Sequence, residues 1–342
     1  MCGTSYYRGG TFFAAVTALA EPAHSPLSPT TIFAPVSTPA QSIFELSLFV
    51  LTITAAIFIV VFSLLAYAVV KFRRRGTSDR REPAQVYGST QVELAWTVIP
   101  VLIVVVLFLA TARVIASIQN VEQPANAINV TVIGHQYWWE YRYPSLNVVT
   151  ANELHIPVSD PAHPTPTVLT LLSADTDHSF WVPRLGGKTD LIPNHPNSMW
   201  MDPHETGLYL GQCAQYCGTQ HAKMLLRVYV DSREDFNKWI QEQQQPAHIA
   251  AKESEGQRIF ERTACVSCHT VAGTPANGTD GPVLTHLMSR QTIAAGAASN
   301  MLGSLIAWID NPAAIKPGCK MPSMGLSAQQ SAAVALYLET LK

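Results

Sequence analysis

The stretch that decides the fold is GQCAQYCGTQHAKM, residues 211–224. It places two thiols, an imidazole and a thioether within the twelve residues 213–224. Soft sulfur ligands together with imidazole select copper or zinc, and a thioether favours copper, because zinc is normally held by Cys, His and carboxylates. The simpler alternative is a disulfide beside an unrelated histidine. The pattern predicts a metal site on a loop between two strands of a β domain.

A further strong ligand has to come from elsewhere in the chain. His178 is the best candidate, because it stands in the aromatic and apolar segment DHSFWVP, residues 177–183. Such neighbours shield a metal from water and tune its potential.

The residues around these ligands predict an all-β domain over 122–232, followed by a linker helix within 233–250. Short β-branched and aromatic runs alternate with clusters of Pro, Gly and Asn, which is typical of a sandwich or barrel. These runs span 128–133, 148–156, 168–172 and 225–230. The polar segment 232–245 reads as a helix, and Pro246 ends it.

Upstream, two long uncharged runs predict a transmembrane hairpin over 41–118. They span 46–70 and 94–112, which are 25 and 19 residues. As helices they reach roughly 37 and 28 Å, enough to cross the hydrocarbon core. A pair of buried helices in a soluble core is the alternative, but runs this long and apolar disfavour it.

The loop between the two runs predicts the orientation in the membrane. Loops rich in Lys and Arg stay in the cytoplasm, so the β domain and the C-terminus are expected on the extracytoplasmic side. The basic residues are Lys71, Arg73, Arg74, Arg75, Arg80 and Arg81.

Downstream, the sequence CVSCH, residues 265–269, is a signature for covalent attachment of a c-type haem. Cys265 and Cys268 would form the thioether links, and His269 would bind the iron. The region 251–342 has helical ends, 253–262 and 328–341, around a loop-rich middle. It predicts an all-α haem domain.

Composition fits these assignments. Only 13% of residues are charged while 48% are hydrophobic, which indicates that part of the chain lies in lipid. The net charge of −2 gives no reason to expect nucleic acid as a partner. Residues 1–20 fit a secretory signal peptide, with an uncleaved tail as the alternative. Cys2 and Cys319 receive no role.

The ligand pattern resembles subunit II of haem–copper cytochrome c oxidases, in which a cupredoxin domain binds the binuclear copper centre CuA. The resemblance rests on the ligand loop together with HSFWVP at 178–183 and KTDLIP at 188–193. It implies a set of copper ligands, of which Gln215 contributes its backbone carbonyl. These are His178, Cys213, Gln215, Cys217, His221 and Met224.

One position departs from the family. Many members carry Glu where Gln215 stands, and that carboxylate binds magnesium at the interface with subunit I. The backbone carbonyl of residue 215 does not depend on the side chain, so its role toward copper is retained. The side-chain amide of Gln215 is a weaker magnesium ligand than a carboxylate, so magnesium binding at this interface is left open.

Other segments support the same resemblance. The segment QVELAWTVIP, residues 91–100, is similar to the start of the family's second helix, which makes Glu93 a candidate mouth of a proton pathway into subunit I. An interfacial Glu that fixes helix depth is the alternative. The segment GHQYWWE, residues 134–140, matches the aromatic stretch beside CuA, so Tyr137 and Trp138 are candidates for electron entry, with ordinary aromatic packing as the alternative.

The C-terminal region resembles class I cytochromes c. In these proteins the first and last helices cross with a small residue against an aromatic one, and Gly256, Phe260 and Tyr337 fit this arrangement. The segment NP…KPGCKMPSMGLS, within 311–327, is similar to the segment that carries the methionine ligand. It favours Met321 over Met324, because Met321 precedes a proline.

A haem domain fused behind a CuA domain resembles the caa3 branch of the family. This implies a bacterial plasma-membrane subunit with both domains on the periplasmic side, partnered by subunit I and other oxidase subunits. Electrons would come from cytochrome c or another respiratory complex and pass through haem c and CuA to subunit I.

Three rivals are considered. A CuA-bearing nitric oxide reductase subunit shares these parts, but the second helix with Glu93 favours the oxidase. A membrane-tethered electron shuttle without a catalytic partner is the rival from another class of protein. A quinol oxidase subunit is disfavoured, because such subunits lose the copper ligands.

Overall fold

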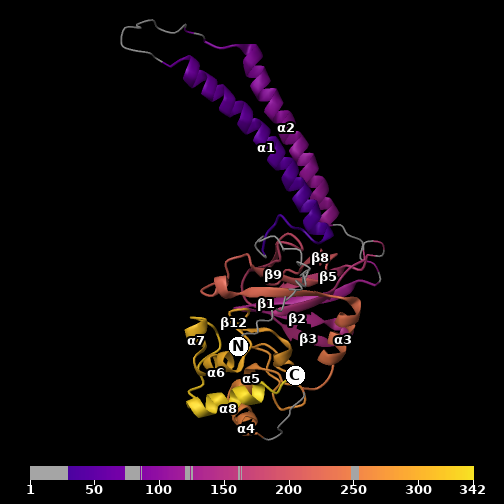
Figure 1. Ribbon diagram of the computed structural model, residues 1–342, viewed down its shortest axis with the longest axis vertical. Coiled ribbons are helices and arrows are strands. Elements are labelled where there is room, and N and C mark those ends of the chain that lie inside the picture. The colour runs from indigo at the N-terminus through magenta and orange to yellow at the C-terminus, as the bar shows by residue number, and fades with distance from the viewer. Residues whose placement is uncertain are drawn as a thin grey trace, which may run out of the picture.

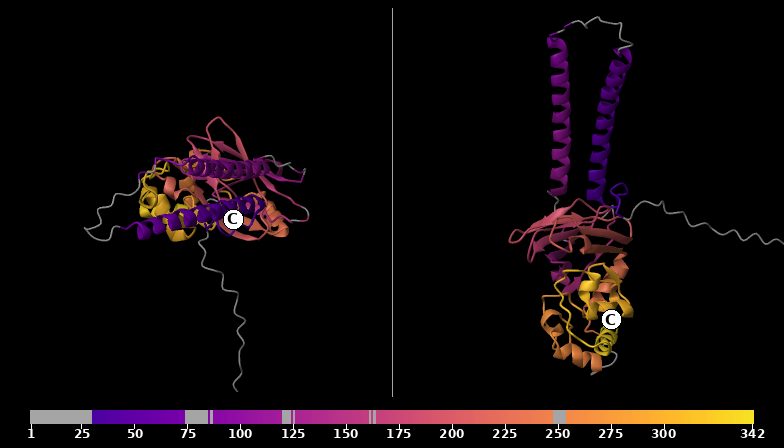
Figure 2. Two further views of the ribbon diagram at one scale, coloured as in Figure 1. Left: turned by 90° about the horizontal axis from the view of Figure 1, so that it is seen from above. Right: turned by 90° about the vertical axis from the view of Figure 1, so that its left-hand side faces the viewer.

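The computed structural model describes residues 30–73, 85, 87–119, 124, 126–160, 162, 164–247 and 254–342. The predicted signal peptide and four of the loop arginines lie outside these residues. Figure 1 shows three parts in a row, with the β domain between a helical hairpin and a small helical domain. A second view along a perpendicular direction shows the same order (Figure 2).

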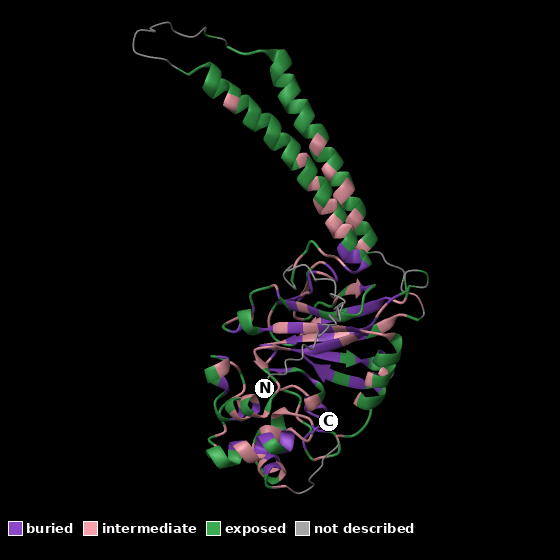
Figure 3. Ribbon diagram, in the orientation of Figure 1, coloured by how far each residue is buried: buried purple, intermediate pink, exposed green. Residues whose placement is uncertain are grey.

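The hairpin consists of α1 (Thr38–Lys71) and α2 (Thr90–Gln119). Both helices have a mean hydropathy of 2.8 in their most apolar window, and none of that window is buried inside the protein. Figure 3 shows this exposure along almost the whole hairpin. Since water would penalise so much exposed apolar surface, lipid is the environment that this surface fits. Both helices are longer than the uncharged runs. The polar residues at their ends continue the backbone hydrogen bonds of the helix outside the hydrocarbon core.

The base of the hairpin is joined to the β domain by specific hydrogen bonds. Thr38 Oγ1 donates to Asp202 Oδ2 at 2.6 Å, at the start of α1. Trp200 Nε1 donates to the Ile118 carbonyl at 2.7 Å, at the end of α2. Both helices are therefore held at the same face of the β domain.

The β domain is a sandwich of two five-stranded sheets, with strand orders β3-β2-β1-β5-β8 and β4-β10-β9-β6-β7. Parallel pairs, β1 with β5 and β10 with β4, occur beside antiparallel ones. The strands are β1 (Ile128–His135), β2 (Trp138–Tyr143), β3 (Val148–Ala151), β4 (Glu153–Pro157), β5 (Thr167–Ser173), β6 (His178–Trp181), β7 (Thr189–Leu191), β8 (Asn197–Met201), β9 (Gly207–Cys213) and β10 (Leu225–Asp231).

Residues 148–156 form two strands rather than the single run that their composition suggests. Asn152 has a φ of 64°, and its side-chain carbonyl accepts the Trp139 N–H at 3.0 Å. Asn tolerates this left-handed conformation, so the chain leaves one sheet and enters the other at this residue. Helix α3 (Arg233–Gln243) follows β10, with Ser232 as its N-cap.

The C-terminal domain is built around α4 (Glu255–Arg262) and α8 (Ala328–Leu338), which begin at the N-caps Ser254 and Ser327. Phe260 and Tyr337 pack ring against ring, with centroids 5.6 Å apart, where these helices cross. Shorter elements fill the space between them: α5 (Cys265–Cys268), β11 (Thr292–Ile293), β12 (Ala298–Ser299), α6 (Leu302–Asp310) and α7 (Pro312–Ile315).

Candidate metal centre and cofactor cavity

The loop between β9 and β10 carries most of the predicted copper ligands. It is closed at its base, where the Cys213 N–H donates to the Met224 carbonyl at 3.0 Å. Strand β6 pairs with β9 so that Phe180 lies opposite Cys213. This register brings His178, at the start of β6, to the loop.

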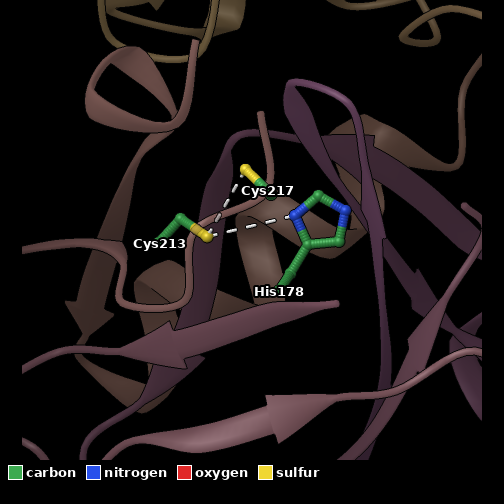
Figure 4. A group of neighbouring side chains, drawn as sticks. All are labelled: His178, Cys213 and Cys217. Atoms are coloured by element: carbon green, nitrogen blue, oxygen red, sulfur yellow. Dashed lines mark hydrogen bonds between the residues drawn. The ribbon is translucent and has the colours of Figure 1, made fainter. Parts of the chain in front are cut away.

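Three ligand atoms meet at one point. His178, Cys213 and Cys217 are all buried, and their donor atoms lie within 4.8 Å of one another. Figure 4 shows the His178 ring and the two thiols pointing toward one another. The sulfur atoms are 3.9 Å apart and both cysteines are free, so no disulfide joins them. Two thiols and an imidazole around one point form the soft donor set that copper prefers.

The remaining predicted ligands extend this cluster. Cys217 Sγ lies 3.8 Å from His221 Nδ1 and 3.8 Å from Met224 Sδ. Cys213 Sγ lies 3.1 Å from the Gln215 carbonyl oxygen. The structure thus brings the whole predicted ligand set together, while the exposed Gln215 side chain lies at the surface.

The surroundings favour a thiolate. The neighbouring Cys217 sulfur, 3.9 Å away, lowers the pKa of Cys213, and the His178 ring acts in the same direction, while burial opposes both. The neighbouring Cys213 raises the pKa of Cys217, and burial adds to the shift. Thiolates are the form that binds metals, so this pair is prepared to release protons when a metal enters.

Two residues that the sequence analysis did not single out hold the cluster. Asp175 Oδ1 lies 2.8 Å from His178 Nε2, while Gln136 Nε2 donates to the Cys217 carbonyl at 2.6 Å. Burial lowers the pKa of His178, but Asp175 and Cys213 outweigh it and raise the pKa. Asp175 stands three residues before His178 and could have been noticed from that spacing. Gln136 is distant in sequence, although it lies within the segment 134–140 that was expected beside the copper site.

The haem signature borders a separate cavity of about 390 Å³. This volume is within the range of cofactor pockets, roughly 300–1,000 Å³. Cys265, Cys268 and His269 line it together with largely apolar side chains such as Phe260 and Trp308. The residues fit a large flat apolar cofactor.

His269 is oriented for iron binding. Its Nδ1 lies 2.7 Å from the Pro282 carbonyl, which fixes the ring and leaves Nε2 as the donor atom. Burial lowers the pKa of His269, against the effect of the Pro282 carbonyl, so the neutral ring is favoured. A neutral imidazole is the form that binds iron.

The cavity lining also includes both methionine candidates and the buried Arg290. Met321 and Met324 both line the cavity, so its lining does not choose between them. Arg290 also lines it, and its Nε is buried without a hydrogen-bond partner among the described residues. Burial lowers the pKa of Arg290 to about 10, with Glu153 opposing the shift. The Nη2 of Arg290 donates to the Val283 carbonyl at 2.8 Å, so the guanidinium is partly paired, and its remaining donors suit an acidic edge on a bound haem.

The two aromatic candidates border the haem cavity. Tyr137 and Trp138 line the cavity from the copper side, and the Trp138 ring stacks on His135 at 4.1 Å. Glu93 lies in the first turn of α2, at the end of the hairpin away from the β domain. It is exposed, which places it where a neighbouring subunit could be reached.

Comparison with known proteins identifies the family. Three family models match: the transmembrane domain of cytochrome c oxidase subunit II over residues 28–114, its periplasmic domain over 152–230, and cytochrome c over 253–342. Cytochrome c oxidase subunit 2 of Alkalihalophilus pseudofirmus is 32% identical over 89% of this chain and 88% of its own length. This chain belongs to the cytochrome c oxidase subunit 2 family.

Another relative and a solved structure are also similar to parts of this chain. The subunit 2 of Bacillus sp. strain PS3 is 32% identical over 79% of this chain and 80% of its own length. A crystal structure of the periplasmic domain of subunit II from Bradyrhizobium japonicum is 26% identical, covering 36% of this chain and 96% of that one, with a TM-score of 0.33.

Family membership settles the main features of the chain. It is an electron-entry subunit of a haem–copper oxidase, it is a membrane protein, and it acts together with other oxidase subunits. Copper and haem are the cofactors that its two extramembrane domains imply. Oxygen reduction takes place in the partner subunit, so enzymatic activity belongs to the complex.

Proposed function

We propose that this subunit takes electrons from cytochrome c or another respiratory complex and passes them through haem c and a binuclear CuA centre to subunit I. The observation that carries the proposal is the convergence of the loop donors on His178, with sulfur contacts of 3.8–3.9 Å. Bound copper and haem would supply one-electron carriers, and the residues of this chain hold and tune them.

The proposed copper ligands have distinct tasks. Cys213 and Cys217 would bridge the metals, while His178 and His221 would each bind one of them. Met224 and the Gln215 carbonyl would complete the set. Burial of both thiols excludes water and limits reorganisation when charge moves.

The proposed haem site divides its tasks in a similar way. Cys265 and Cys268 would attach the haem covalently, and His269, held by the Pro282 carbonyl, would be the proximal ligand. Met321 would be the distal ligand, and a methionine there raises the potential.

Tyr137 and Trp138 are proposed to carry electrons toward the copper site, and Glu93 to open a proton pathway toward subunit I. We further propose a bacterial plasma-membrane location, with the basic loop in the cytoplasm and both cofactor domains in the periplasm. The basic residues Lys71 and Arg73 at the end of α1 support this orientation.

The decisive test is cofactor content of the purified oxidase complex, measured by metal analysis, optical spectra and EPR. Two coppers assigned to this subunit with a mixed-valence EPR signal, together with one covalently bound haem, are expected. A Cys217→Ser variant should lose the mixed-valence signal and keep the haem. A single copper or zinc at this site, or no haem left on this chain after organic extraction, would contradict the proposal.

A further inference from the structure

Two contacts join the haem domain to the copper domain, and the first is made by segment 290–296. Glu153 of β4 is buried, and its carboxylate accepts the N–H groups of Gln291 and Thr292 at 3.0 and 2.9 Å. Leu225 N–H of β10 donates to the Ala295 carbonyl at 3.1 Å. Charge-assisted hydrogen bonds in a buried site fix orientation, so the two domains have a defined relative position.

A second contact joins the loops that carry the proposed ligands of both cofactors. Gln220 Nε2 donates to the Pro317 carbonyl, and Lys223 Nζ donates to the Ile315 carbonyl at 2.6 Å. Gln220 and Lys223 flank His221, while segment 315–317 precedes Met321. The copper-side and haem-side loops therefore lie directly against each other.

Lys316 lies at the centre of this second contact. It is only 3% exposed, and its ammonium donates to the Tyr137 carbonyl at 2.7 Å and to the Ala294 carbonyl at 3.1 Å. One acceptor belongs to the copper domain and the other to the haem domain. Burying an ammonium is costly unless its hydrogen bonds are made, so separating the domains would leave it with one protein acceptor fewer.

The residue that Lys316 holds connects both sites. Tyr137 forms part of the wall of the haem cavity. On its other side it packs against Gly218, where an added Cβ would lie 2.6 Å from Tyr137 Oη. Gly218 stands between Cys217 and His221, so the Tyr137 ring bridges the haem cavity and the copper loop.

We propose that Lys316 is a positioning residue that fastens the haem cavity to Tyr137 and thereby sets the rate of electron transfer from haem to copper within this chain. The inference rests on the proposed function for its kinetic consequence, but its structural part does not. The simpler role for Lys316 is to support its own domain through the Ala294 carbonyl alone. If Lys316 fastens the two domains, replacing it should change hydrogen exchange in the peptide that contains Tyr137. If it supports only its own domain, exchange in that peptide should stay the same.

The test compares Lys316→Met with Lys238→Met in the purified oxidase complex. Lys238 lies on the exposed face of α3 and controls for loss of one positive charge. Hydrogen–deuterium exchange is followed in the peptides that contain Tyr137 and Ala294. Loss of the Lys316 ammonium is expected to raise the exchange rate of both peptides about tenfold in Lys316→Met. In Lys238→Met the exchange rate of both peptides should stay unchanged.

The second measurement is the rate of haem-to-copper electron transfer after photoreduction of the haem, with optical and EPR spectra of both sites as the control. Lys316→Met is expected to slow this electron transfer about tenfold while the spectra of both sites stay unchanged. The reason is that the rate depends steeply on how the two sites are placed relative to each other. Glu153→Gln, which weakens the first contact from the copper side, should change exchange and rate in the same direction.

Defined outcomes overturn the inference. Unchanged exchange at the Tyr137 peptide, with faster exchange only at Ala294, would reduce Lys316 to a support within its own domain. If Lys316→Met does not retain haem, Lys316→Arg is used as the test variant instead. A planar guanidinium cannot occupy the position of the ammonium, so this variant also disturbs the contact. If the unsubstituted complex transfers no electron from haem to copper, the proposed function fails, while the exchange result still decides whether Lys316 fastens the domains.

Discussion

Among single residues, two glycines stand directly behind the histidines that we propose as ligands. An added Cβ at Gly134 would lie 2.8 Å from His178 Cδ2, and one at Gly281 would lie 2.6 Å from His269 Cε1. Both distances are too short for ordinary packing, so a side chain at either position would turn the ring. The glycines therefore contribute to ligand orientation through the space that their missing side chains leave.

Gly134→Ala tests this at the copper site. We expect the displaced His178 ring to lower copper affinity by about 10–100-fold, the usual cost of disturbing the surroundings of a ligand. Competition with a copper chelator measures it. Gly186→Ala is the matched control, because its Cβ would meet only Met199 Cε at 3.5 Å. Equal affinities in the two variants would remove the steric role of Gly134.

The two cavity methionines give a second prediction for single residues. Met321→Ala should lose the haem–methionine charge-transfer band and lower the haem potential, because a thioether ligand stabilises the reduced iron. Met324→Ala should keep the band. Optical spectra and redox titration of the purified complex distinguish them, and the reverse result would transfer the ligand role to Met324.

Between elements, the crossing of α4 and α8 holds the haem domain together. Gly256 lies where the helices touch, and an added Cβ would come within 1.9 Å of the Ala333 carbonyl oxygen. The crossing closes one side of the cavity, since Phe260 of α4 and Leu338 of α8 both line it. The close approach that glycine permits is what brings these side chains to the cofactor.

Gly256→Ala should therefore destabilise the haem domain by about 1–3 kcal/mol, as overpacking does. Gly303→Ala, in helix α6, is the control, because its Cβ would meet nothing within 4 Å. Alanine there should be neutral or stabilise by about 0.5–1 kcal/mol, since it restricts the unfolded chain and favours helix. Thermal unfolding followed by haem absorbance measures both. A loss of stability in Gly303→Ala equal to that in Gly256→Ala would contradict the packing argument.

For the whole molecule, the order of the parts fits a chain that carries charge toward a membrane partner. The copper domain lies against the base of the hairpin, and the haem domain lies on its far side (Figures 1 and 2). In this arrangement the proposed external donor would meet the haem domain, which lies farthest from the hairpin. The copper loop lies between the haem cavity and the hairpin side.

The proposed orientation can be tested with cysteine labelling. Tyr87 lies just before the start of α2, on the side of the loop that joins the two helices, and Lys238 lies on α3. Both native side chains are exposed, and each is replaced by Cys in a separate variant. A membrane-impermeant maleimide should label Lys238→Cys in spheroplasts and Tyr87→Cys only in inverted vesicles, relative to the unsubstituted chain. The opposite pattern would reverse the topology.

The family, both candidate sites and the two membrane helices could be predicted from the sequence because each depends on residues that are close along the chain. The ligand loop, the haem signature and the uncharged runs are local patterns, and helix rise or loop length converts them directly into structure. His178 was also singled out from its own distinctive segment, and its Nδ1 lies 3.9 Å from Cys213 Sγ.

What only the tertiary structure decided lies between distant residues. Asn152 divides an apparently continuous strand because the two sheets need a left-handed residue there. Lys316 is buried against Tyr137, 179 residues away, because the haem domain docks on the copper loop. No local pattern encodes such a contact, since it results from the packing of two folded surfaces, and that packing determines how the two sites face each other.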